Sequence, residues 1–161
     1  MSIQPKADTH PSQDAELRRI IALLGGDRVL DHPPESPIEV HDMLLHGLPG
    51  KALTHLVDSV VVLRKAASLE KAVGISLRTF QRRKDAPGKP LSLEQSSRTW
   101  KFADILARAT AVLGSQEDAE QWLERPAIGL DQQRPVDLLT TPAGVKLVED
   151  YLGRLEYDVY T

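Results

Sequence analysis

The chain contains no cysteine among its 161 residues, which excludes disulfide bonds, thiol nucleophiles and thiolate metal sites. Its longest unbroken aliphatic run, Val60–Leu63, is far shorter than the roughly 20 residues that a membrane-spanning helix needs. The first residues are polar and have no apolar centre, so we expect no secretory signal. These absences favour a cytoplasmic protein that has no membrane partner.

Motifs for catalysis and for metal binding are also missing. All five histidines lie in the first third of the chain, and His41 and His46, five residues apart, do not share a helix face. The glycines near positions 25 and 47 resemble helix stops and not phosphate-binding loops. Carboxylates such as Asp104 and Glu149 occur at helix-surface positions without a nucleophile motif. We expect a protein that is not an enzyme and that needs no cofactor and no metal ion.

The hydrophobic pattern is helical in nearly every segment, without sustained alternation or a hairpin motif, and predicts an all-α fold. Ser36, Ser92 and Ser115 each precede a helical stretch as N-cap candidates. The longest predicted helix runs from Leu93 to about Leu113. Its heptad-like apolar seam would serve either as a self-association surface or as part of the protein's own core; it consists of Leu93, Trp100, Ala103, Ala107 and Ala111.

The segment from Ser68 to Lys84 carries the pattern of a helix-turn-helix. A short apolar helix meets Gly74, which suits a tight turn because glycine adopts positive φ without a Cβ clash. Ser76 can cap a second helix, on which Leu77 and Phe80 can face the first helix. A second helix of this kind can enter the major groove of DNA.

The distribution of charge supports binding to DNA through this segment. The whole chain has a net charge of −3, yet residues 64–89 carry 8 basic and 2 acidic side chains. Phosphate binding needs a local excess of positive charge and not a high overall pI. The alternative is a solvated basic face on an ordinary helix pair.

The C-terminal end is unusually aromatic. The chain ends in Tyr157-Asp158-Val159-Tyr160-Thr161, whereas chain ends are normally polar. We expect the last helix to end near Glu156 and the segment after it to project into a concave pocket of a partner. Tyrosine is favoured at interfaces because it combines a large contact area with a hydroxyl group. Alternatively, the two tyrosines pack back on their own domain.

Taken together, these segments resemble the Xre/MbcA/ParS family of antitoxins. The resemblance covers roughly residues 36–161 and rests on GISLRTFQRRKD, on PLSLEQSSR, and most of all on the stretch from WLERP to LGRLEYDVY. It implies an antitoxin that covers the active site of a RES-domain, NAD-consuming toxin with its C-terminal domain. It further implies a complex that represses its own promoter, and we expect a homodimer within a hetero-oligomeric complex.

The resemblance also implies an organisation and a set of functional residues. We expect a flexible segment over residues 1–13, an Xre-like helix-turn-helix domain over 14–88 and a toxin-binding domain over 91–161. The residues expected to contact operator DNA are Ser76, Arg78, Thr79, Gln81, Arg82, Arg83 and Lys84. Those expected to contact the toxin are Arg154, Glu156, Tyr157, Asp158, Val159, Tyr160 and Thr161, with Gly153 in the same motif.

Two residues depart from the helix-turn-helix pattern. Glu70 lies four positions before the turn glycine, where a small residue is usual, and Arg83 takes a position that is often apolar. The main alternative to an antitoxin is a stand-alone transcriptional regulator whose C-terminal domain dimerises or senses a ligand. A gene for a small RES-type toxin beside this one would favour the antitoxin.

Overall fold

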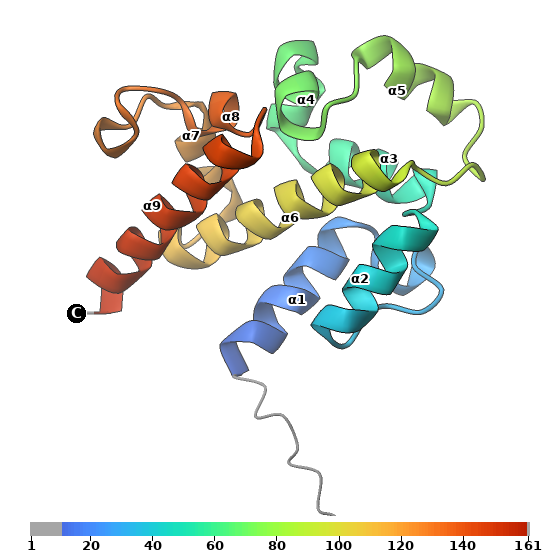
Figure 1. Ribbon diagram of the computed structural model, residues 1–161, viewed down its shortest axis with the longest axis horizontal. Helices are drawn as coiled ribbons and strands as arrows, with labels where there is room; N and C mark the ends of the chain where they lie inside the picture. The colour runs from blue at the N-terminus through green and yellow to red at the C-terminus, as the bar shows by residue number, and fades with distance from the viewer. Residues whose placement is uncertain (1–10, 161) are drawn as a thin grey trace, which may run out of the picture.

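The computed structural model describes the backbone of residues 11–160 and the side chains of residues 13–158. Over this range the chain forms nine α-helices and three short 3-10 helices and no β-strand, which confirms the predicted all-α class (Figure 1). The α-helices are α1 Pro11–Leu23, α2 Pro37–His46, α3 Gly50–Ser59, α4 Ala66–Val73, α5 Leu77–Lys84, α6 Leu93–Leu113, α7 Gln116–Glu124, α8 Pro135–Leu138 and α9 Pro142–Tyr160. The 3-10 helices are η1 Gly26–Arg28, η2 Val61–Arg64 and η3 Ile128–Leu130.

Local sequence explains where most helices begin. Ser92 and Gln95 form the predicted capping box at the start of α6, in which each side chain bonds the other residue's backbone N–H. Ser115 accepts a hydrogen bond from the backbone N–H of Asp118 at 3.1 Å, as predicted for α7. At α2 the Ser36 cap is also present, but the Glu39 carboxylate accepts from the backbone N–H of Glu35 and not of Ser36.

Helix α6 forms the centre of the molecule, and α1, α2, α4, α7 and α9 all contact it (Figure 1). Nine of its residues are buried, and Phe102, Ile105 and Leu106 are almost fully removed from solvent. Of the predicted seam, Trp100, Ala103 and Ala107 lie in the protein's own core, whereas Leu93 is exposed. The seam therefore does not form a self-association surface around Trp100.

Both ends of the chain differ from expectation. Helix α1 begins at Pro11, within the segment predicted to be loose, and residues 1–10 lie outside the described residues. The prediction that the last helix ends near Glu156 is wrong, since α9 continues to Tyr160. The reason is local: no glycine or proline follows Gly153 to stop the helix. Residues 157–160 therefore belong to the end of α9 and do not form an extended tail.

An ion cluster joins the first helix of the predicted helix-turn-helix to the C-terminal part of the chain. The Asp137 carboxylate on α8 accepts hydrogen bonds from Lys71 on α4 at 2.7 Å and from Arg134 at 2.8 and 2.9 Å. The hydrogen bonds from Arg134, and after them those from Lys71, lower the pKa of Asp137 to about 2, against the opposing effect of partial burial. The ionised carboxylate thus holds α4 and α8 together.

We predict that this cluster makes stability depend on pH. Because the pKa of Asp137 is lower in the folded protein than in the unfolded chain, its contribution is full above about pH 4 and is lost as the pH falls toward 2. Asp137→Asn should lower the free energy of unfolding at pH 7 by about 1–2 kcal/mol and flatten its decline between about pH 4 and 2. Urea titrations at several pH values measure this.

Asp150→Asn is the matched control. Its carboxylate is 59% exposed and lies 3.6 Å from Lys146 on the same helix, so its loss should cost at most about 0.5 kcal/mol. Equal pH profiles for the two variants would show that Asp137 has no special role.

Candidate functional sites

The first candidate site is the α4–Gly74–α5 unit, which has the predicted helix-turn-helix arrangement. Helix α4 buries Leu69, Ala72 and Val73, and α5 buries Phe80. Gly74 follows α4 with φ of 72°, and Ser76 caps α5 by accepting from the backbone N–H of Thr79 at 3.1 Å. Leu77, which the pattern also predicts to face α4, is 38% exposed.

The predicted DNA-contacting residues separate into two groups in the structure. Arg78, Gln81, Arg82 and Lys84 are exposed along α5, and the Lys84 ammonium lies 5.0 Å from the centre of the Phe80 ring. Ser76 and Thr79 are half-buried and bond each other at the start of the helix. The exposed set forms one basic face, which is suited to phosphate oxygens and to the edges of bases.

Arg83 is half-buried and is held by contacts within the protein. Its guanidinium donates to Gln95 Oε1 at 2.8 Å and to the Pro90 carbonyl at 3.3 Å, so it ties α5 to the capping box of α6. This contact accounts for a charged residue at a position that is often apolar. The acceptor is a capping glutamine 12 residues away, which helix periodicity alone does not reveal.

The helix-turn-helix is also fixed from the side of its turn. The Arg98 guanidinium on α6 donates to the carbonyl oxygen of Lys71 at 2.8 Å and to that of Leu139 at 3.4 Å. A Cβ on Gly74 would lie 2.1 Å from Arg98 Nη1. Gly74 thus provides a left-handed backbone conformation, as the sequence predicts. It also leaves space for Arg98, and the sequence does not indicate this second role.

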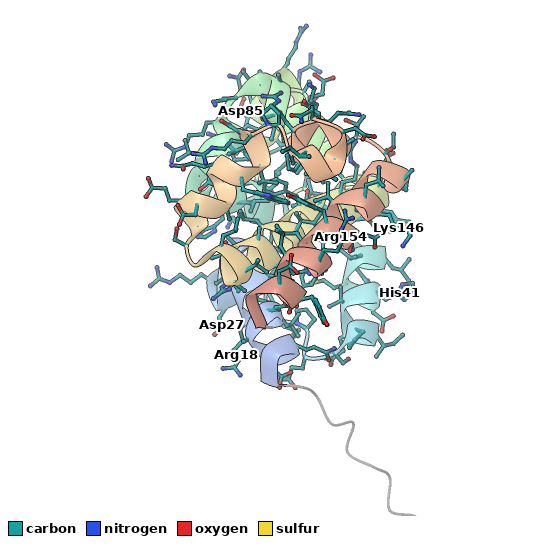
Figure 2. The ribbon with its side chains drawn as sticks, turned by 90° about the vertical axis from the view of Figure 1, so that its left-hand side faces the viewer. Arg18, Asp27, His41, Asp85, Lys146 and Arg154 are labelled. Atoms are coloured by element: carbon teal, nitrogen blue, oxygen red, sulfur yellow. The ribbon has the colours of Figure 1, made fainter. Side chains whose placement is uncertain are left out.

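The second candidate site is the outward face of α9. The exposed fractions of Leu147 and Tyr157 are 53% and 71%, and the intervening Arg154 is exposed as well (Figure 2). These residues line an open groove of about 900 Å³ between α9 and the η3 loop, where Ile128 is 83% exposed. Leu147 and Tyr157 therefore present large exposed side chains along this groove, among charged residues such as Asp150 and Arg154.

Stacked rings support this face from within. The rings of Trp122 and Tyr151 stack with their centres 6.0 Å apart, and the Arg154 guanidinium lies 5.5 Å from the centre of the Tyr151 ring. Tyr151 is also close to Gly129, where a Cβ would lie 2.5 Å from the ring. The η3 loop and α9 are thus packed together, and Arg154 is positioned at the surface.

Gly153, in contrast, has no packing role within the chain. A Cβ at this position would meet nothing within 4 Å, although the residue lies in the middle of α9 and lines the groove. A glycine inside a helix is less favourable than alanine by about 1 kcal/mol. Its absence of a side chain leaves the helix backbone open to close approach by another molecule.

The predicted toxin-contacting residues do not all lie on this face. Arg154, Tyr157 and Asp158 line the groove. Glu156 is half-buried and lies on the side of α9 that faces α1. Its carboxylate is close enough to Glu16 on α1 to affect the pKa of Glu16. That pKa is raised mainly by burial, against the effect of Arg108, and the Asp104 and Glu156 carboxylates raise it further. The side chains of Val159, Tyr160 and Thr161 lie outside the described residues. The exposed Leu147 and Ile128 are not among the predicted contacts, because those come from the C-terminal motif, which starts at Gly153.

The two candidate sites lie at opposite ends of the molecule, with α5 at the right of Figure 1 and α9 at the left. Among the described residues, no group of three or more histidine, aspartate or glutamate side chains could hold a metal ion. The described helices also include none that is long and apolar enough to cross a membrane.

Comparison with known proteins identifies two domains in the chain. Residues 39–104 match the antitoxin Xre-like helix-turn-helix domain, and residues 108–157 match the antitoxin Xre/MbcA/ParS C-terminal toxin-binding domain. An antitoxin Xre from Pseudomonas putida is 31% identical over 125 residues, which cover 77% of this chain and 76% of the relative. The chain is a member of the Xre antitoxin family.

Two further relatives of the antitoxin carry the same description. An antitoxin Xre from Yersinia enterocolitica is 32% identical over 71% of this chain and 87% of its own length. One from Photorhabdus laumondii is 28% identical over 82% of this chain and 88% of its own length. The family membership confirms the prediction of a binding protein with a helix-turn-helix and a toxin-binding domain, and not an enzyme.

The Arg98 contact gives a prediction about the turn. Gly74→Ala should lower the free energy of unfolding by about 1–2 kcal/mol, because alanine is strained in the left-handed backbone conformation. It should lower it by about 1 kcal/mol more because Arg98 must give up its hydrogen bonds. Gly114→Ala is the matched control, since Gly114 also has positive φ but nothing lies within 4 Å of its Cβ position. Denaturant titrations compare the two variants.

The double-mutant cycle isolates the role of Arg98. In an Arg98→Ala background, Gly74→Ala should lower the free energy of unfolding by no more than Gly114→Ala does. An undiminished cost of Gly74→Ala in that background would contradict the contact as the cause.

Proposed function

We propose that this antitoxin neutralises a RES-domain, NAD-consuming toxin with residues 91–161 and represses its own operon with residues 14–88, in the cytoplasm. The observation that carries the first part is the outward face of α9, where Leu147, Gly153, Arg154 and Tyr157 face solvent together. The second part is supported by the exposed basic face of α5. We further propose that the antitoxin acts as a homodimer within the complex.

The α9 face has the chemistry of an anchoring surface. Aromatic and arginine side chains dominate the binding energy of many protein interfaces. Tyr157 supplies such a ring without burying it in its own domain, and Arg154 is pre-positioned by the Tyr151 ring. Since both are held on a helix, little conformational freedom is lost when the partner binds.

The C-terminal end of α9 offers negative charge to the toxin. An NAD-binding pocket must hold an anionic cofactor, so we expect basic groups in the toxin's active site. Helix C-termini carry a partial negative charge, and Asp158 lies in the last turn of α9. The end of the helix would therefore approach the active site as a rigid unit.

We predict that Gly153→Ala separates stability from toxin binding. The added methyl group should stabilise the isolated antitoxin by about 0.5–1 kcal/mol, because alanine favours the helix, while it weakens the complex by blocking close approach. Tyr157→Ala should weaken the complex by about 2 kcal/mol without a loss of stability. Thermal unfolding, toxin affinity and growth rescue on co-expression with the RES-type toxin measure these effects.

Val61→Ala is the matched control, because Val61 is 59% exposed but lies in η2 and outside the α9 groove. If Gly153→Ala and Tyr157→Ala both bind and rescue as the unmodified antitoxin does, the α9 face does not contact the toxin.

For DNA, we predict that Arg78→Ala and Arg82→Ala each weaken binding to the promoter of the antitoxin's own operon. A lost base contact should cost about 1–3 kcal/mol, and a lost phosphate contact should reduce the salt slope by about 1. Arg83→Ala should act differently and lower the free energy of unfolding, because Arg83 bonds Gln95 and Pro90. Fluorescence anisotropy at several salt concentrations, with parallel denaturation, distinguishes these effects.

Arg125→Ala serves as the control for charge alone, since Arg125 is an exposed arginine at the end of α7. Equal DNA affinities for Arg82→Ala and Arg125→Ala would exclude α5 as the recognition helix.

A further inference from the structure

Helix α2 presents an exposed stripe that nothing in the described chain covers. The helix has no buried residue, and it rests on the core through its half-buried inner side, formed by Val40, Met43 and Leu44. Its outer side carries Ile38, His41, Asp42 and Leu45 at spacings of three, four and seven, which places all four on one line along the helix. Ile38 and Leu45 are 65% and 55% exposed.

The side chains of the central pair, His41 and Asp42, are exposed to solvent. Within the described part of the chain, neither the His41 imidazole nor the Asp42 carboxylate has a hydrogen bond or an ion pair; only the Asp42 carbonyl oxygen accepts one, from His46. His41 lies on the side of α2 that faces away from the body of the protein (Figure 2). The stripe therefore combines two exposed apolar ends with a donor and an acceptor between them.

The order of these residues is self-complementary. If two copies of α2 pack antiparallel about a two-fold axis between positions 41 and 42, Ile38 of each copy faces Leu45 of the other. In the same arrangement His41 of each copy faces Asp42 of the other, which gives two equivalent pairs of a hydrogen-bond donor and an acceptor. A parallel arrangement would instead oppose His41 to His41 and Asp42 to Asp42. Two-fold symmetry permits both arrangements, but only the antiparallel one pairs unlike residues, donor with acceptor.

We infer that the outer face of α2 is the homodimer interface of this antitoxin, with the two helices antiparallel. The inference rests on the proposed self-association and is independent of toxin binding. It leaves the recognition helix uncovered, because α5 lies in a different part of the molecule (Figure 1). A ten-residue helix buries less than the roughly 800 Å² per partner of a standard interface, so the dimer is weak in isolation. Two adjacent half-sites on DNA strengthen it by holding both copies together.

The absence of cysteine makes disulfide cross-linking a direct test, since each introduced thiol is the only one in its chain. Ile38→Cys mixed with Leu45→Cys should cross-link rapidly under mild oxidation. Ile38→Cys alone should not, because the two copies of position 38 lie seven residues or about 10 Å apart along the helices, beyond the reach of a disulfide. Val61→Cys, equally exposed but outside α2, gives the rate of random collision. Non-reducing gels of the full chain, with and without promoter DNA, measure the rates.

Each result decides the matter. Cross-linking of the mixture that is several-fold faster than for either single variant and for Val61→Cys supports the interface and its register. Ile38→Cys alone cross-linking as fast as the mixture would overturn the antiparallel arrangement. A dimer in sedimentation that lacks the mixed cross-link would overturn the α2 interface and leave self-association standing, whereas a monomer at all concentrations and on DNA would overturn both.

A charge exchange provides a second measurement that does not depend on oxidation. Asp42→Lys places a lysine against His41 of the partner copy and should raise the dimer dissociation constant about threefold to tenfold. Combining it with His41→Asp restores opposite charges across the axis and should bring the constant back toward its original value. Equal dissociation constants for the original protein and both variants would contradict the pairing of His41 with Asp42.

Discussion

The burial of α6 is the constraint on which the rest of the structure depends. Helices from both halves of the chain pack against it, and its buried residues belong to one continuous hydrophobic core. Because apolar burial stabilises by about 25 cal/mol per Å², the fully buried Phe102, Ile105 and Leu106 fix the position of α6 strongly. The helix-turn-helix at one end and the α9 face at the other are held relative to each other through this helix.

Polar contacts add direction to this packing. Arg98 projects from α6 onto the turn at Gly74 and reaches the carbonyl oxygen of Leu139, so one side chain bonds both functional halves. Asp137 bonds Lys71 on α4 in parallel. These contacts link α8, which adjoins α9, to α4 and to the turn before α5. The basic face of α5 and the outward face of α9 are thus carried by one connected frame.

The sequence predicts helix limits and helix caps, but it does not predict contacts between residues that are distant along the chain. The limits of α6 and the caps at Ser76, Ser92 and Ser115 follow from short-range patterns, and the structure has them as predicted. The sequence shows Arg83 at a position that is often apolar, but only the structure shows that it bonds Gln95. Trp100 fits a surface seam and a core equally well until α6 is placed, and then it is buried.

The same distinction applies to the proposed interfaces. The resemblance to known antitoxins identified the end of α9, but it did not show that Glu156 turns toward α1 or that Leu147 and Ile128 are exposed. The stripe on α2 was hidden because its leucine and isoleucine fit an ordinary amphipathic helix. The structure is needed to show that these residues lie on the side of α2 that does not contact the core.

Hydrogen exchange of the backbone amides can show whether toxin and DNA bind at opposite ends of one rigid frame. Binding of the RES-type toxin should slow exchange in α9 and in the η3 loop while leaving α5 unchanged. Promoter DNA should slow exchange in α5 and leave the exposed turns of α9 unchanged. Protection of α5 by the toxin, or an absence of protection along α9 in a stable complex, would contradict the account.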